Sequence, residues 1–359
     1  MLKSNDSVNV EGQARDALAR VLSEVPGLDR VDIQDTRGGA DALIDFLCRL
    51  VFQGREQLLA GEVNSSGQPR HIQGALFQLK RYLETQSPGV IPLVVAPYLS
   101  ERVRDLCVDS GASYLDLQGN ARIVFPGFFL FRETAGKPAN ERREMRSLFK
   151  PKSAAVLRCM LRQPARAWRV SELSSETSVS LGHVSNVRTS LLDREWAEVS
   201  EGGLRLSQPD ALLDAWRDAY EPPAAVRQEF YTTLHGATLD DVLRAESTAS
   251  SASGHAILSG FSAARWLAPY GRTSTCSFYA DAKGADHLRR VLGLVAAGRG
   301  SNVEIAIVED TGLLRDAIEP ASGIHCTSVV QTYLDLCASG ERGQEAAEHL
   351  RRERLRWQD

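Results

Sequence analysis

Apolar residues recur at helical spacing in the middle of the chain, between residues 154 and 161. Pro164 ends the predicted helix, and Ala167 to Val170 is typical of a short strand. Ser171 is then expected to cap a second helix, because a serine oxygen there accepts from the first free amides. The pattern therefore predicts short helices joined by a tight connection.

A third helix is expected from about Leu181, with Val184, Val187, Leu191 and Leu192 facing inward. Two alternating strands, 197–200 and 204–207, follow around a glycine turn. This order of elements predicts a winged helix-turn-helix. The alternative is a three-helix bundle that merely exposes polar residues to water.

The outward side of the third helix carries small, polar and cationic residues, which suit a helix in a DNA major groove. The expected specific contacts come from His183, Ser185, Asn186, Arg188 and Thr189, with Asn186 and Arg188 reading base edges. Phosphate contacts are expected from Lys150, Lys152 and Arg169 and from Arg205 on the wing.

Positive charge gathers just before and within this segment, although the whole chain carries a formal charge of −4. Such a patch favours salt-dependent phosphate binding over general adhesion, and its alternative is a solvated linker. Its cations are Lys137, Arg142, Arg143, Arg146, Lys150, Lys152, Arg158, Arg162, Arg166 and Arg169.

The 359 residues are enough for three domains, and the pattern predicts an α/β (α+β) multidomain chain. The expected domains are 1–136, an α/β block; 137–221, the winged helix-turn-helix; and 222–359, a second mixed α/β block. In the first block, apolar strands alternate with helices, which predicts a sheet covered on both faces. The serine-rich stretch 246–254 is expected to be a mobile loop.

The first block resembles the PD-(D/E)XK restriction-endonuclease-like superfamily. Asp45 is expected in one strand, and Glu62-Val63-Asn64 closes the next. In active members the two acids hold a divalent metal and a lysine two residues later helps to activate water. Because Asn64 takes the lysine position, the resemblance implies a degenerate nuclease site at Asp45, Glu62 and Asn64. The alternative is that both acids are ordinary strand-edge carboxylates.

The last block contains Leu258-Ser-Gly-Phe-Ser-Ala-Ala264, a Val329–Leu336 segment and Gly340–Ala347. Together with the preceding winged segment, these motifs resemble the AbiEi family of type IV toxin-antitoxin systems over about residues 150–359. The resemblance implies autoregulation at inverted repeats, an antitoxin role for the C-terminal domain and a cognate toxin partner. Within this block, Asp335 is expected to cap a helix or to face solvent.

Composition excludes several classes of protein. With 43% hydrophobic and 25% charged residues, the chain is neither disordered nor fibrous. No apolar run is long enough to span a membrane, no signal-peptide core opens the chain, and a cytoplasmic location is expected. The six scattered cysteines suggest reduced core residues, and neither histidine spacing nor glycine loops indicate a metal or a cofactor.

The sequence therefore predicts a sequence-specific regulator that binds duplex DNA, without catalytic residues, as a possible homodimer. Two alternatives stay open. The first is a metal-dependent nuclease that the winged helix targets to DNA. The second is an antitoxin that acts mainly through protein contacts.

Overall fold

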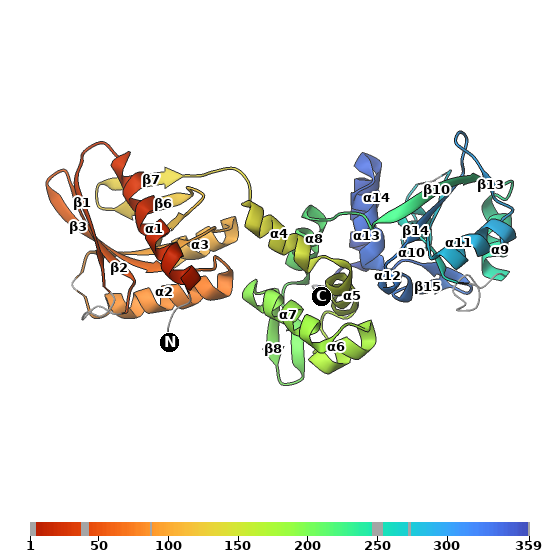
Figure 1. Ribbon diagram of the computed structural model, residues 1–359, viewed down its shortest axis with the longest axis horizontal. Helices are drawn as coiled ribbons and strands as arrows, with labels where there is room; N and C mark the ends of the chain where they lie inside the picture. The colour runs from red at the N-terminus through yellow and green to blue at the C-terminus, as the bar shows by residue number, and fades with distance from the viewer. Residues whose placement is uncertain (1–4, 37–42, 87, 246–253, 272–273, 358–359) are drawn as a thin grey trace. The chain divides into compact units, whose positions relative to one another are not determined.

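The structure is a computed structural model that describes residues 5–36, 43–86, 88–245, 254–271 and 274–357. Its chain divides into two compact units (Figure 1). Unit 1 comprises Met1–Arg143 with Leu192–Glu195, and unit 2 comprises Glu144–Leu191 with Trp196–Asp359. Most of the serine-rich stretch that was expected to form a mobile loop lies outside the described residues.

Unit 1 contains a mixed sheet whose strands run in chain order from β1 to β7. The β3–β4 and β4–β5 pairs are parallel, and the other neighbours are antiparallel. The elements are α1 (Asn5–Ser23), β1 (Leu28–Asp35), β2 (Phe46–Phe52), β3 (Arg55–Val63), α2 (Pro69–Leu83), β4 (Val90–Ala96), α3 (Glu101–Asp109), β5 (Ser113–Asp116), β6 (Ala121–Phe125), β7 (Phe128–Arg132) and α4 (Ala139–Leu148), which crosses the unit boundary.

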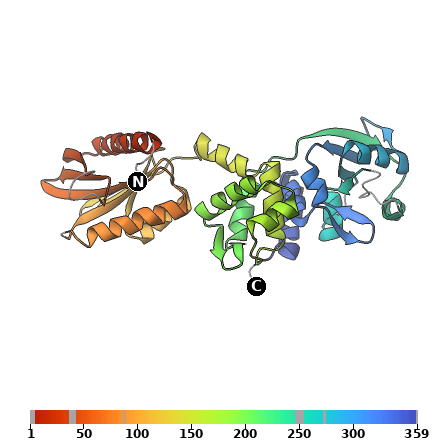
Figure 2. The same ribbon diagram turned by 60° about the horizontal axis from the view of Figure 1, so that its bottom comes forward.

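Both faces of this sheet are covered, as the apolar strands predicted (Figure 2). Successive residues of β4 alternate between two cores, because side chains along a strand point to opposite faces. Leu93 and Val95 pack in the core that includes α1, whereas Val94 and Ala96 pack in the core that includes α2 and α3. A strand buried on both sides therefore has no polar position.

After the end of α4, unit 2 continues with three helices, a two-stranded antiparallel sheet and a fourth helix. Phe149 stacks on the buried Trp216, with ring centroids 5.3 Å apart, which packs the start of this module against its last helix. The elements are α5 (Pro151–Arg162), α6 (Val170–Thr177), α7 (Leu181–Asp193), β8 (Ala197–Ser200), β9 (Gly203–Leu206) and α8 (Pro209–Asp218).

The start of α6 differs from the sequence expectation. Ser171 lies inside the helix, and Arg169 occupies the N-cap position, where its backbone amide donates to the Glu172 carboxylate at 3.0 Å. The segment before α6 is not a full strand, since only Trp168 forms an isolated bridge, with Leu204 of β9. The glutamate in the first turn caps the backbone amide of the N-cap residue, whereas the serine was expected to accept from the first free amides of the helix.

The rest of unit 2 is a second seven-stranded sheet, in the order β13-β10-β14-β12-β11-β16-β15. The elements are β10 (Ala225–Tyr231), α9 (Gly236–Ala245), β11 (Ala256–Leu258), α10 (Gly260–Leu267), β12 (Cys276–Ala280), α11 (Ala282–Val291), β13 (Val295–Ala296), β14 (Val303–Val308), α12 (Thr311–Arg315), β15 (Ile318–Ala321), β16 (Ile324–Cys326), α13 (Val329–Cys337) and α14 (Gly340–Arg354).

The two faces of the second sheet have different neighbours. Phe278 and Leu288 belong to the core that includes α9 and α11, whereas Tyr279 packs on the opposite face with residues of α12. Helix α5 packs against α12 and α13 (Figure 1). The first module of unit 2 therefore contacts the domain built on the second sheet.

All six cysteines are free, and four of them are buried. Burial raises the pKa of the Cys48 and Cys107 thiols to about 12, which keeps them protonated and unreactive at neutral pH. In the described parts of the chain, no helix combines the length and the apolar character that crossing a membrane requires.

Candidate nucleic-acid interface

Helix α7 has two chemically distinct sides. Val184, Val187 and Leu191 are buried at helical spacing against the core. The opposite side exposes Ser185, Asn186 and Thr189, together with Gly182, whereas His183 and Arg188 are half-buried. The helix thus presents a polar ridge on a fixed apolar base.

The side chains of this ridge differ in how they are held. His183 Nε2 lies 2.9 Å from Ser153 Oγ on α5, and Thr189 Oγ1 donates to the Ser185 carbonyl at 3.2 Å. Across the described ranges, neither Asn186 nor Arg188 makes a side-chain hydrogen bond or ion pair. These two side chains can therefore meet a ligand without first breaking an internal contact.

The β8–β9 hairpin depends on one glycine. Gly203 has φ +132°, and a Cβ there would lie 2.3 Å from the Trp168 carbonyl oxygen. On the adjacent strands Arg205 faces Glu198 and forms an ion pair with it, and each side chain is about half exposed. Exposed pairs of this kind contribute about 1 kcal/mol or less, so Arg205 remains available for a phosphate.

The expected run of cations does not form one surface. Arg158 and Arg162 both bind Asp316 of the second-sheet domain, and Arg146 lies 3.3 Å from Glu221. Arg166 lies over the Trp168 ring, 3.7 Å from its centroid. Within the described part of the chain, six cations of the run remain exposed without such a contact, namely Lys137, Arg142, Arg143, Lys150, Lys152 and Arg169.

Arg158 is the clearest departure, because it is only 3% exposed. Its Nε donates to Asp316 at 2.9 Å and its Nη1 to the Gln331 side-chain oxygen at 3.3 Å. Burial lowers its pKa, and nearby acids oppose that effect. This arginine joins α5 to the second-sheet domain and is unavailable to DNA.

Asp335 does not face solvent as expected, nor does it cap a helix. It is 8% exposed and accepts hydrogen bonds at a single oxygen, Oδ1, from Tyr220 OH at 2.5 Å, Tyr279 OH at 3.0 Å and Gln331 Nε2 at 3.1 Å. Burial raises the pKa of Asp335 to about 6, whereas the hydrogen bonds from Tyr220, Gln331 and Tyr279 and the charge of Arg227 act in the opposite direction.

This polar cluster was missed by sequence reasoning, although a signal was present. Asp335 is the one charged residue of α13, whose residues 330–336 are all buried. A carboxylate inside such a run must be paired or hydrogen-bonded, because an unpaired buried charge costs several kcal/mol. Its partners come from distant segments, so sequence alone could not name them.

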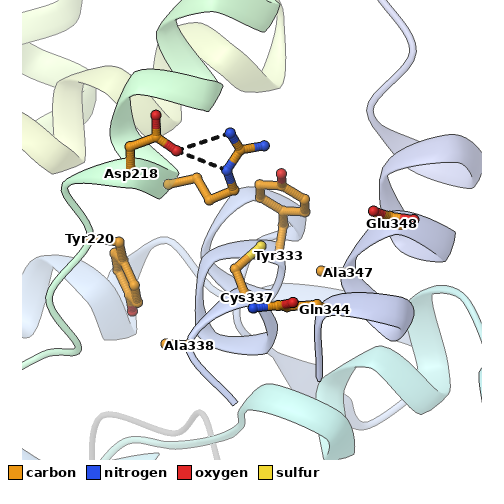
Figure 3. Close-up of a pocket in the computed structure, with 9 residues that line it drawn as sticks. Asp218, Tyr220, Tyr333, Cys337, Ala338, Gln344, Ala347 and Glu348 are labelled. Carbon is orange, nitrogen blue, oxygen red and sulfur yellow. Dashed lines mark hydrogen bonds and ion pairs between the residues drawn. The ribbon is translucent and has the colours of Figure 1, made fainter. Parts of the chain in front are cut away.

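Two cavities lie near this cluster. One, of about 520 Å³, is lined by Asp218 and Tyr220 and by residues of α13 and α14, including Tyr333 (Figure 3). The other, of about 360 Å³, is lined by strands of the second sheet, by the start of α10 and by Asp335. Both lie within unit 2.

In unit 1, Asp45 and Glu62 lie near each other, because Asp45 precedes Phe46 and Glu62 follows Gly61, which pairs with Phe46. Both acids are buried. Asp45 Oδ2 accepts from the Val63 amide at 2.8 Å. The Asn64 side chain accepts from the Ser66 amide at 3.1 Å and donates to the His71 carbonyl at 3.3 Å. Asp45 and Asn64 thus both hold local backbone.

Asp116 also holds local backbone, and it accepts four hydrogen bonds. It is fully buried, and its two oxygens accept from the amides of Leu99, Gln118 and Asn120 and from the Asn120 side chain, at 2.8–3.0 Å. The carboxylate therefore holds the turn after β5, the role of a turn-capping acceptor. Over the described ranges, no group of three or more histidine, cysteine or acidic residues is arranged to hold a metal.

Comparison with known proteins bears on unit 2. Residues 205–356 match the model of the family described as transcriptional regulator, AbiEi antitoxin, type IV TA system. The match begins in β9 and ends just beyond α14, so it covers the second-sheet domain and less than half of the chain. No curated protein and no solved structure matches.

Proposed function

We propose that this protein is a sequence-specific transcriptional regulator of the AbiEi antitoxin type. In this proposal α5, α6, α7, β8 and β9 form a winged helix-turn-helix that binds duplex DNA. The observation that carries it is the polar ridge of α7, exposed above the buried Val184, Val187 and Leu191. The family match to the adjoining domain independently supports a regulator.

In the proposed complex, α7 enters the major groove and Asn186 and Arg188 contact base edges, because their side chains need break no internal contact. Arg205 on the wing and the exposed Lys150, Lys152 and Arg169 contact phosphates. Ser185 and Thr189 add hydroxyl contacts, and His183 contributes only where it can leave Ser153.

The second-sheet domain is proposed to carry the antitoxin role and to meet a cognate toxin, as the family description implies. A homodimer on a palindromic site would double the α7 contacts at a spacing of one helical turn. The three-domain division 1–136, 137–221 and 222–359 is part of the same proposal. Unit 2 contains most of the second of these domains and all of the third, whereas residues 137–143 and Leu192–Glu195 of the second belong to unit 1.

The test starts from a random DNA pool, so that no operator has to be assumed. Selected duplexes are titrated with wild type, Arg188→Ala, Asn186→Ala and the matched control Arg290→Ala, whose exposed arginine lies on α11. Each base contact is expected to be worth about 1–3 kcal/mol, so the α7 variants should lose affinity and selectivity while the control retains both.

A salt titration separates this proposal from an antitoxin that acts only through protein contacts. Phosphate binding predicts that the logarithm of the affinity falls linearly with the logarithm of the salt concentration. Selection of no preferred sequence, or equal losses in the Arg188 and Arg290 variants, would refute the DNA-reading role of α7.

We also propose that unit 1 has a nuclease-like fold without nuclease activity. The order α1-β1-β2-β3-α2-β4 and the adjacent Asp45 and Glu62 support the likeness, and Asn64 in the position of the expected lysine argues against cleavage. Plasmid incubated with Mg²⁺ or Mn²⁺ should stay intact. Cleavage that disappears in Glu62→Ala would establish the rival function, a targeted nuclease.

A further inference from the structure

The cavity of about 360 Å³ beside Asp335 has a lining that suits a charged small molecule. It is lined by strands β10, β12 and β14, by the beginning of α10 and by the end of α13. Its volume falls within the range in which proteins bind small molecules, near the lower end. The cavity is therefore large enough for a single small metabolite.

The lining contains a buried acceptor that lacks a donor. Among the residues that the structure describes, the Oδ2 atom of Asp335 has no hydrogen-bond partner, although the residue is more than nine-tenths buried and its other oxygen accepts three hydrogen bonds. Leaving such an oxygen unsatisfied costs free energy, and a bound donor removes that cost. A positively charged amino group suits this position best, because it adds charge to the hydrogen bond.

The start of α10 supplies hydrogen-bond donors to the same cavity. Gly260 and Phe261, in its first turn, have amides without an acceptor inside the helix, and the N-cap residue Ser259 makes no capping hydrogen bond. All three residues line the cavity. The space around Gly260 is open, since a Cβ added there would meet no atom within 4 Å. Amides at a helix N-terminus favour a carboxylate.

The remaining charges of the lining offset each other, because Arg227 and Glu304 form an ion pair. The lining therefore still offers Asp335 as an acceptor for a cation and the amides at the start of α10 as donors for an anion. We propose that this cavity binds a free amino acid, with its ammonium group on Asp335 and its carboxylate at the start of α10.

The position of this site gives the ligand a route to the rest of unit 2. Asp335 also binds Tyr220, which follows α8, and Gln331, which in turn accepts a hydrogen bond from Arg158 of α5. A bound ligand would therefore affect the hydrogen bonds that join α5 and the end of α8 to the second-sheet domain. Ligand binding itself does not depend on the proposed DNA-binding function and is measured without DNA.

The experiment screens the L-amino acids singly against the full chain by isothermal titration calorimetry. At least one is expected to bind with a Kd of about 1 mM or tighter. Asp335→Asn should weaken that binding by about 10-fold or more, because the amide lacks the charge, while the exposed Asp286→Asn should leave it unchanged. The decarboxylated amine and the deaminated acid of the same compound should each bind about 10-fold more weakly or worse.

Hydrogen exchange of the wild type with the best-binding amino acid provides a readout that does not depend on a variant folding. Peptides covering Gly260–Leu267 and Val329–Cys337 should both gain protection. The proposal is overturned if no amino acid binds at about 10 mM, if Asp335→Asn folds and binds as the wild type does, if the deaminated acid binds equally well, or if neither peptide responds.

Discussion

Asp335 makes the stability of unit 2 depend on pH in a direction opposite to that of most carboxylates. Its pKa is raised from 3.8 to about 6, chiefly by burial. Between these two values the folded state binds more protons than the unfolded state, so the free energy of unfolding falls as pH rises. The stabilisation by the neutral carboxyl is present at low pH and is lost as pH rises through about 6.

The size of the effect follows from the shift. A difference of about two pKa units corresponds to roughly 3 kcal/mol between full protonation and full ionisation, of which roughly 2 kcal/mol falls between pH 4 and pH 7. In Asp335→Asn this contribution is absent. The stability of wild type relative to the variant should therefore be about 2 kcal/mol greater at pH 4 than at pH 7.

The assay is urea unfolding of both proteins at several pH values, followed by tryptophan fluorescence. Trp216 is fully buried on α8 and reports the unit that contains Asp335. Comparing wild type with variant at each pH cancels the titration of all other groups. The matched control is Asp286→Asn, whose side chain is 72% exposed and should show no such trend. A difference that stays constant with pH, or that grows as pH rises, would refute the reasoning.

Three further substitutions test separate parts of the fold. Asp116→Ala leaves four donors without an acceptor, three of them buried, and should cost about 3 kcal/mol or more in thermal unfolding, whereas an unchanged melting temperature would contradict the turn role. Gly203→Ala should cost about 2 kcal/mol or more, because its Cβ meets the Trp168 carbonyl at a backbone angle that alanine resists, and circular dichroism melting checks this. Asp316→Ala should cost about 3–5 kcal/mol, and Arg158→Met less than that, since the methionine removes a buried donor, Nη2, that lacks a partner. The reverse order in urea unfolding would show that the aspartate does not hold the arginine.

Local pattern was sufficient where an element is defined by its own periodicity. Helix α7 begins where the apolar positions predict it, and the apolar strand β4 is buried on both faces as its composition predicts, because helical spacing and apolar runs are properties of consecutive residues. Strand β10, in contrast, was not predicted. Three consecutive polar residues, Arg227 to Glu229, interrupt its apolar positions, and Phe230 is the one residue of the strand that is buried, so it shows no regular apolar alternation.

The sequence predicted only part of the candidate nucleic-acid interface. The exposed polar side of α7 could be read from the sequence, but the cation run could not, because an arginine's charge does not reveal which acid it meets. Arg158 finds Asp316, which lies 158 positions away along the chain. That pairing removes Arg158 from the surface that its neighbours Lys150 and Lys152 still share.

The sequence by itself determined most of the helices, many of the strands and the polar ridge of α7, since these follow from contacts between near neighbours in the chain. Only the tertiary structure decided that Asp335 is buried, that Tyr220 and Tyr279 bind it, and that a cavity opens beside it. The physical reason is that burial and hydrogen-bond partners depend on which distant segments pack together, and no local pattern encodes that choice.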